Sequence, residues 1–186
     1  MEIVIILGLI FFNGILSMSE IAMVSARKSR LETAAKKGSK TAKTALRLAN
    51  EPDRFLSTIQ IGITLIGILT GLYSGEALAG DLARWLETIG IPQAHSLTLA
   101  KGIIVILVTY LTLILGELVP KHLGMNAPEK IARLIARPME VLSKIASPFV
   151  WLLSASTQAV IRLTGLHTST ENKVTEEEIK AIIQEG

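Results

Sequence analysis

Three apolar segments, each long enough to cross a lipid bilayer, constrain the fold of this chain more than any other feature. They are Ile3–Val24, Phe55–Ser74 and Gly102–Val119. About 20 helical residues, rising about 1.5 Å each, cross a hydrocarbon core of about 30 Å. Only 19% of the 186 residues are charged, against about 25% in a soluble domain. The sequence therefore predicts an all-α membrane protein with three transmembrane helices.

The charges between these segments predict the orientation. The stretch Arg27–Arg54 holds nine basic and three acidic residues, whereas Gly75–Leu97 holds three acidic residues and one arginine. By the positive-inside rule, the basic stretch is cytoplasmic and the Gly75–Leu97 loop is outside. We therefore expect a multi-pass protein of the inner (plasma) membrane, with its N-terminus outside and its C-terminus cytoplasmic. A juxtamembrane position already explains the basic residues, so nucleic acid is not an expected partner.

A belt of cytoplasmic juxtamembrane helices is expected beside the spans. The apolar spacing of Arg27–Asn50 is typical of an amphipathic helix, and Gly38-Ser39 divides it into two short surface helices. Pro52 disfavours helix at the residue before it. Asp53 is therefore predicted to N-cap the second span.

The remainder of the chain is predicted to hold short helices and then a polar linker. Pro128, Pro138 and Pro148 are expected to divide the sequence after the third span into short helices. For Ile145–Ile161 we expect an interfacial or half-inserted helix pair in preference to a fourth crossing. We place the transmembrane domain with its juxtamembrane helices at 1–166.

Residues 167–186 are expected to form a linker and the start of a truncated cytosolic region. Gly165–Lys173 is polar, and Thr175 and Glu178 are spaced as the capping box of a soluble helix. Ending at Gly186, barely two turns later, this segment suggests a membrane domain excised from a longer protein.

One polar residue in each apolar segment lies at a similar depth below the inner membrane face. These residues are Glu20, Gln60 and Glu117, and their positions along the helices fall within about one turn of a common plane. Ionisable groups inside hydrocarbon are costly and mark functional sites. If the three spans are neighbours, these side chains meet in a single cavity open to the cytoplasm.

The backbone near Glu117 favours a cation site. Pro120 has no N–H, so the carbonyl of Gly116 loses its donor four residues on. A free carbonyl beside a carboxylate is a pair of hard oxygens, which suits Mg²⁺ or Na⁺. The other spans add polar groups to this level, namely Asn13, Ser17 and Glu20 on one stripe of the first span, Ser19 if that helix kinks, and Gln60, Gly62 and Thr64 on the second.

Structural roles are the alternatives for single residues in this set. Ser17 alone would bond the carbonyl four residues before it. Glu20 would reach the membrane surface or pair with Arg27. Lys121 at the membrane boundary would either anchor the helix or gate an ion.

An enzyme is not expected. The apolar segments contain no aspartate or histidine, and the chain has no H-E-x-x-H sequence, no glycine-rich phosphate loop and no cysteine. Gly67 and Gly71 instead form a small-xxx-small pair, which allows close helix packing either within the chain or between two copies.

Three stretches together, Phe12–Ala22, Ile59–Leu65 and Leu115–Lys121, resemble the transmembrane domain of the CorC/CNNM magnesium-transport family. The members of this family are CBS-domain-containing membrane proteins, some once labelled hemolysins. The resemblance covers essentially the whole chain. It implies three transmembrane helices, a homodimer, and cytosolic CBS domains that bind ATP with Mg²⁺ and lie outside this sequence.

The resemblance also implies Mg²⁺ export coupled to Na⁺ uptake. A membrane-anchored Mg²⁺ sensor or scaffold, which regulates other transporters and holds a structural ion, is the alternative. Relatives with asparagine in the second span differ from this chain, which has Ile63 and Gly67 there. The residues implied as metal ligands are Ser17, Ser19, Gly62, Gly116 and Glu117, and those implied along the ion pathway are Asn13, Glu20, Gln60, Thr64, Pro120 and Lys121.

Overall fold

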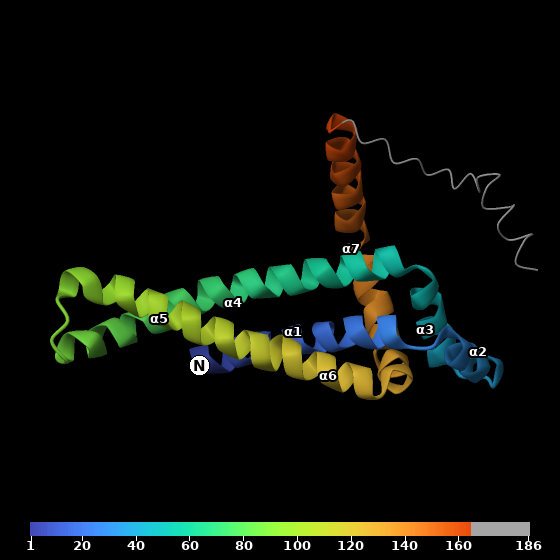
Figure 1. The fold of residues 1–186 in the computed structure, drawn as a ribbon, viewed down its shortest axis with the longest axis horizontal. Coiled ribbons are helices and arrows are strands. Elements are labelled where there is room, and N and C mark those ends of the chain that lie inside the picture. Colours follow the sequence, from blue (N-terminus) through green and yellow to red (C-terminus); the bar gives the residue numbers. More distant parts are fainter. Residues whose placement is uncertain (165–186) are drawn as a thin grey trace, which may run out of the picture. The chain divides into compact units, whose positions relative to one another are not determined.

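The computed structural model describes residues 1–164, and these residues fold entirely into helices and short connections (Figure 1). Contacts divide the chain into two compact units, Met1–Ser147 and Pro148–Gly186. The helices in chain order are α1 (Glu2–Ser25), α2 (Lys28–Lys36), α3 (Lys40–Asn50), α4 (Pro52–Thr88), α5 (Gln93–Leu113), the π-helical turn η1 (Ile114–Leu118), α6 (Val119–Asn126) and α7 (Pro128–Leu163).

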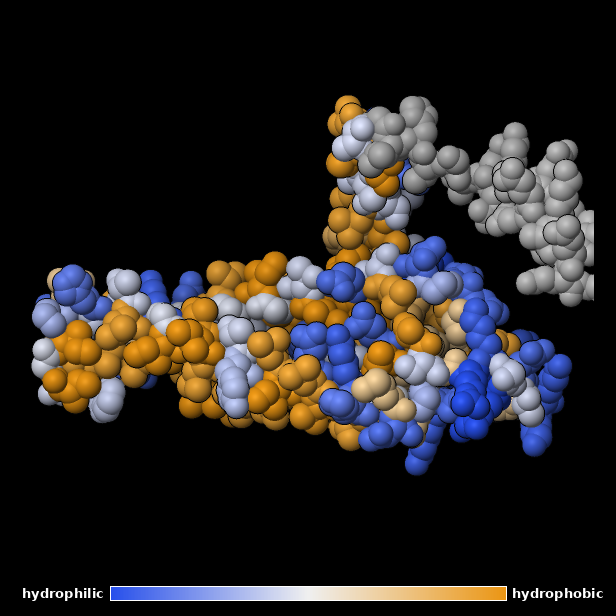
Figure 2. All heavy atoms as spheres, in the orientation of Figure 1, coloured by the Kyte–Doolittle hydropathy of each residue, from blue (hydrophilic) through white to orange (hydrophobic). Residues whose placement is uncertain are grey.

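Three helical stretches are long and apolar enough to cross a membrane, as predicted. They are α1, α4 and the rod Gln93–Asn126 that α5, η1 and α6 form together. Figure 2 shows hydrophobic residues along α4 and α5 and hydrophilic ones gathered near α2 and α3. The prediction of an all-α membrane protein with three spans is therefore confirmed. The sequence interpretations of Gly165–Lys173 and of Thr175 and Glu178 lie outside the described residues.

The prediction of a loop at Gly75–Leu97 is wrong, because this region is mostly helical. α4 continues through Thr88, and α5 begins at Gln93 after a turn in which Gly90 has a φ of 99°. Small apolar residues hold the two extensions together in a buried cluster formed by Ala79, Ala83, Leu86 and Ala100. Hydropathy falls beyond Ser74, but the alanines keep the helical spacing. The packing of these alanines prolongs the helices past the hydrophobic segments.

The juxtamembrane helices break where the sequence predicts. α2 ends before Gly38, which has a φ of 92° that favours glycine, and Ser39 Oγ accepts a hydrogen bond from Ala42 N–H at 3.3 Å. The cap of α4 differs from the prediction. Glu51 occupies the N-cap without a side-chain cap bond, and Pro52 is the first helical residue. Pro52 takes the first helical position because its fixed φ suits the start of a helix. Asp53 therefore lies in the first turn of α4 and not at the N-cap.

The prolines do not divide the last segment into short helices. Pro128 begins α7, but the helix runs on through Pro138 and Pro148. In the first unit, Ile135, Ala136 and Met139 of α7 are buried in the main core. Burial of this apolar face outweighs the hydrogen bond lost at Pro138. The pair of helices expected in Ile145–Ile161 is instead part of α7, which is not among the candidate spans of the described residues.

Glycines bring α1 close to its neighbours, and Figure 1 shows α1 lying between α4 and α6. A Cβ at Gly62 of α4 would lie 2.7 Å from Leu16 Cδ1 of α1. On the other side of α1, a Cβ at Gly14 would lie 2.9 Å from Pro120 Cγ. At Gly124 of α6 it would lie 2.8 Å from the backbone oxygen of Met18. The separation between α1 and α6 is therefore set by residues that lack a side chain.

Replacing Gly124 by alanine is expected to destabilise the fold by about 1–3 kcal/mol, because the backbone of α1 cannot easily move away from the new methyl group. Thermal unfolding of the purified protein in detergent measures this as a drop of several degrees in Tm. The matched control is Gly8→Ala on α1, where no atom lies within 4 Å of the added Cβ. Equal Tm values for the two variants would contradict the proposed close contact.

Candidate functional site

The π-helical turn η1 places Glu117 and reshapes the backbone around it. Val119 N–H donates to the carbonyl of Ile114, five residues earlier, so the turn is one residue wider than an α-helical turn. Pro120 supplies no N–H for the Gly116 carbonyl. The carbonyl was expected to be free, but it accepts a hydrogen bond from Asn13 Nδ2 at 3.0 Å, and the bond is buried. A side chain of α1 therefore replaces the donor that the proline removes.

Two buried oxygens of α1 have no hydrogen-bond partner in the described residues. They are Asn13 Oδ1 and Ser17 Oγ, and the side chains are 4% and 1% exposed. A buried polar atom without a partner costs about 1–3 kcal/mol, so each one calls for an explanation. The two residues lie one turn apart on the face of α1 that meets η1. Free oxygens on this face are suited to a cation.

The serine that bonds its own helix is Ser19, although that role was expected of Ser17. Ser19 Oγ donates to the carbonyl of Ile15 at 2.6 Å, and the side chain is fully buried. This bond uses the only hydroxyl proton of Ser19 and leaves its oxygen as an acceptor. Ser17, in contrast, makes no such bond.

Lys121 joins two carboxylates from different spans. Its Nζ lies 2.8 Å from Glu117 Oε1 and 3.7 Å from Glu20 Oε2. Glu20 therefore pairs across the helix interface, and Arg27, its expected alternative partner, is not involved. The three side chains are 28–39% exposed. Two negative charges face one positive charge, so the group keeps one net negative charge.

These residues form one cluster, which we call the α1–η1 cluster and which consists of Asn13, Ser17 and Glu20 from α1 and Gly116, Glu117 and Lys121 from η1 and α6. Within residues 1–164, no three His, Cys, Asp or Glu side chains gather as a metal site. The potential ligands are carboxylate, hydroxyl and amide oxygens. Such oxygens are suited to hard cations, above all Mg²⁺ and Ca²⁺.

The polar residues of α4 do not join the α1–η1 cluster in this structure. Gln60 and Thr64 are exposed on α4. Gly62 faces the fully buried side chain of Leu16, which fills the space between α1 and α4. Burial of Ile59 and Ile66 rotates α4 so that its polar stripe faces outward. Depth along a helix fixes height in the membrane but not the direction of a side chain.

The pairing of Glu20 with Lys121 was missed by the sequence reasoning. No spacing signals it, because the two residues lie on separate helices. The clearest signal for a close contact was the set of glycines in α1 and in the third apolar segment. Gly14 was expected only to mark a kink in the first span, and Gly124 of α6 was not considered, yet both allow the approach that lets Lys121 reach Glu20.

Comparisons with known proteins agree with the arrangement of spans. Residues 4–186 match the family model described as the cyclin M transmembrane N-terminal domain (CNNM). A UPF0053 protein of Synechocystis sp. is 46% identical over 186 residues, which is the whole of this chain and 42% of the relative. The UPF0053 protein YhdT of Bacillus subtilis is 30% identical over 187 residues, again the whole chain and 41% of the relative.

A third relative carries a functional name. The polyamine export protein of Escherichia coli is 29% identical over 185 residues, covering the whole chain and 41% of that protein. The chain thus spans less than half the length of the curated relatives it matches.

Replacing Asn13 by leucine is expected to lower stability by about 1–2 kcal/mol, because the Gly116 carbonyl would lose the side-chain donor that it has within residues 1–164. Thermal unfolding in detergent measures the change. The control is Thr109→Leu on α5, an exposed polar residue of a span that makes no side-chain hydrogen bond in the described part of the chain. An unchanged Tm for Asn13→Leu would show that the bond carries no stability.

Proposed function

Because this chain belongs to the cyclin M transmembrane-domain (CNNM) family, we propose that it carries Mg²⁺ across the membrane through the α1–η1 cluster. The family relationship makes the chain a transporter-like membrane protein rather than an enzyme. Export in exchange for Na⁺ uptake, with the N-terminus outside, completes the proposal. The basic stretch of α2 and α3 supports this orientation.

The observation that carries the proposal is the pair of orphan oxygens, Asn13 Oδ1 and Ser17 Oγ. A bound cation supplies the partner that both atoms lack. Mg²⁺ keeps several of its waters and binds through one or two carboxylates. Glu117 and Glu20 supply two carboxylates here. The carbonyl of Gly116 is a further oxygen of the cluster, whereas the hydroxyl of Ser19 is bonded to the carbonyl of Ile15. Gln60, Gly62 and Thr64 are not part of this set, because Gln60 and Thr64 are exposed on α4 and Gly62 faces Leu16.

Lys121 gives the site an internal competitor for its substrate. Its ammonium group pairs with the carboxylate of Glu117 and lies close to that of Glu20. An incoming cation would bind at the same two carboxylates. Mg²⁺ therefore has to displace Lys121 before both carboxylates can ligate it. The lysine also lowers the cost of holding two carboxylates in the membrane when no substrate is bound.

A polyamine is the second candidate substrate, and Lys121 is the observation that favours it. The carboxylate pair already holds one primary ammonium group. One relative of this chain is named a polyamine export protein. A polyamine also carries primary ammonium groups, and one of them would take the place of the Lys121 ammonium between the two carboxylates.

Two charge-removing variants test the proposed site through Mg²⁺ binding by isothermal titration. Glu117→Gln is expected to weaken binding at least about tenfold, because it removes an anionic ligand. Lys121→Gln is expected to tighten binding about fivefold, because the tethered competitor is gone. Lys101→Gln removes the same charge from an exposed residue of α5 and should change little. Weaker binding in Lys121→Gln would overturn the competitor role.

Flux assays on the protein in liposomes distinguish the candidate functions. Mg²⁺ efflux that depends on a Na⁺ gradient and is lost in Glu117→Gln supports the transporter. Spermidine flux without Mg²⁺ flux supports the polyamine reading. Mg²⁺ binding without flux of either substrate supports the membrane-anchored sensor or scaffold.

The proposal includes a homodimer in which α4 contacts its copy. Gln60, Thr64, Gly67 and Gly71 recur at helical spacing on one exposed stripe of α4. Nothing lies within 4 Å of a Cβ at either glycine, so packing inside the described chain does not explain the small residues. Small residues on an exposed stripe of a membrane helix favour close approach of a second helix.

Replacing Gly71 by leucine tests the dimer without disturbing the monomer. No atom of the described chain lies within 4 Å of a Cβ placed at Gly71, so we expect the fold to be retained. We expect loss of the dimer in crosslinking and in light scattering of the detergent-solubilised protein, because the helices could no longer approach. Gly8→Leu on α1 is the control. Full dimerisation of Gly71→Leu would exclude this stripe as the interface.

A further inference from the structure

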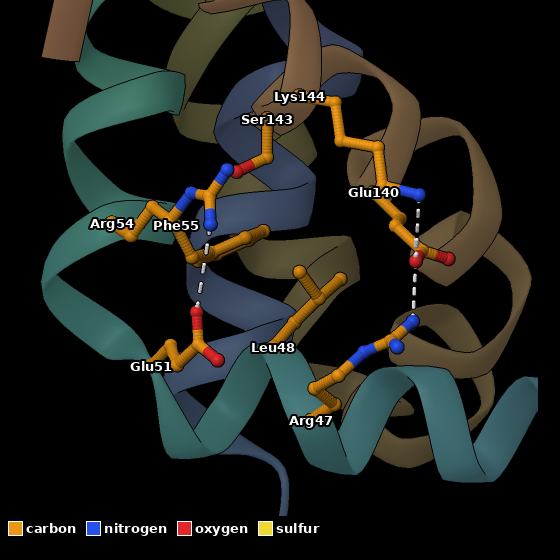
Figure 3. A pocket seen from close by; sticks show the side chains of 8 residues that line it. All are labelled: Arg47, Leu48, Glu51, Arg54, Phe55, Glu140, Ser143 and Lys144. Atoms are coloured by element: carbon orange, nitrogen blue, oxygen red, sulfur yellow. Dashed lines mark hydrogen bonds and ion pairs between the residues drawn. The ribbon is translucent and has the colours of Figure 1, made fainter. Parts of the chain in front are cut away.

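A small cavity lies where α3, α4 and α7 meet, away from the α1–η1 cluster (Figure 3). Its volume is about 180 Å³, below the roughly 300–1,000 Å³ of sites that enclose drug-sized ligands. Arg47, Arg54 and Lys144 line it, one from each of the three helices, and the buried side chains of Leu48 and Phe55 also line it. We call it the α3–α4–α7 pocket. Its size suits a group such as one phosphate.

Two carboxylates balance the three cations only in part. Glu140 pairs with Arg47 and with Lys144, whose Nζ lies 3.4 Å from Glu140 Oε1. Arg54 has only Glu51, at 3.9 Å, and both side chains are about half exposed. Such an exposed pair contributes little. The pocket keeps one net positive charge, and Arg54 is the cation with the weakest partner.

The cations of the pocket have more donors than partners. An arginine has five N–H donors and a lysine has three. Apart from Glu51, Arg54 has one polar contact, from Nη2 to Ser147 Oγ at 3.3 Å. Figure 3 shows the Arg54 guanidinium pointing toward Ser143 over Phe55, and Lys144 pointing toward Glu140. Several donors around one small cavity are suited to an anion with several oxygens.

The position of the pocket along α4 favours a lipid over a soluble anion. Arg54 immediately precedes Phe55, where the apolar part of α4 begins. The neighbouring helices α2 and α3 hold six basic residues and one acidic residue. Basic clusters directly beside a transmembrane helix bind the head groups of anionic lipids. The pocket therefore lies at the level of the head groups, next to the end of a span.

We propose that the α3–α4–α7 pocket binds the phosphodiester of an anionic phospholipid. Arg54 and Lys144 donate to its oxygens, and its single negative charge neutralises the pocket. The bound lipid fastens the first part of α7 to α3 and α4. This site is independent of the proposed cation transport.

Lipid-dependent stabilisation of the purified protein tests the proposal. Phosphatidylglycerol added to protein in neutral detergent should raise Tm, because it binds only the folded state, and phosphatidylcholine should not. Arg54→Gln and Lys144→Gln should each weaken phosphatidylglycerol binding about fivefold. Lys37→Gln removes the same charge from an exposed residue after α2 and should weaken binding less than about twofold. Arg54→Lys should bind between the wild type and Arg54→Gln.

Three results would overturn the proposal. Equal losses in Lys37→Gln and Arg54→Gln would mean diffuse attraction by the basic surface. Equal stabilisation by glycerol phosphate at the same concentration would identify a soluble anion as the ligand. No stabilisation by phosphatidylglycerol would mean that the pocket holds no lipid. The Tm of each lipid-free variant shows whether the variant folds. If Arg54→Gln does not fold, Lys144→Gln tests the proposal instead, because the Lys144 side chain is exposed.

Discussion

The close approach of α1 to η1 and α6 is the contact on which the rest of this structure depends. Gly14 and Gly124 leave no room for a Cβ at the interface, and a Cβ at Gly116 would lie only 3.2 Å from Asn13 Nδ2 and from the Ile10 carbonyl oxygen. Only at this separation does Asn13 reach the carbonyl of Gly116 and Lys121 reach Glu20. Larger residues would separate the helices and break both polar contacts together. The glycines therefore determine whether the α1–η1 cluster can form.

The polar groups of the α1–η1 cluster show how the chain meets the demands of a lipid environment. Lipid offers no hydrogen bonds, so polar groups in a span are satisfied inside the protein. Gly116 is satisfied by Asn13, Ser19 by the carbonyl of Ile15, and the carboxylates by Lys121. The orphan oxygens of Asn13 and Ser17 are the exceptions. A site that is satisfied except where a substrate would bind is stable without the substrate and still able to hold it.

The sequence predicted those features that depend on single helices. Hydropathy gave the three spans, and Gly38 gave the break between α2 and α3. Features that depend on rotation about a helix axis were not predictable. The outward direction of Gln60 and Thr64, and the pairing of Lys121 with Glu20, follow from which apolar side chains are buried. Tertiary packing likewise carries α7 through Pro138, against the local preference of that residue.

The extension of α4 and α5 beyond the apolar segments has a mechanical consequence. Ala79, Ala83, Leu86 and Ala100 hold the two helices together at their shared end, and Ser96 Oγ donates to Glu87 Oε1 at 2.7 Å. α4 and α5 thus behave as one rigid unit. The first turns of α1, in contrast, are largely exposed. A rearrangement that opens the two membrane faces in turn would therefore move α1 relative to the rigid pair of α4 and α5.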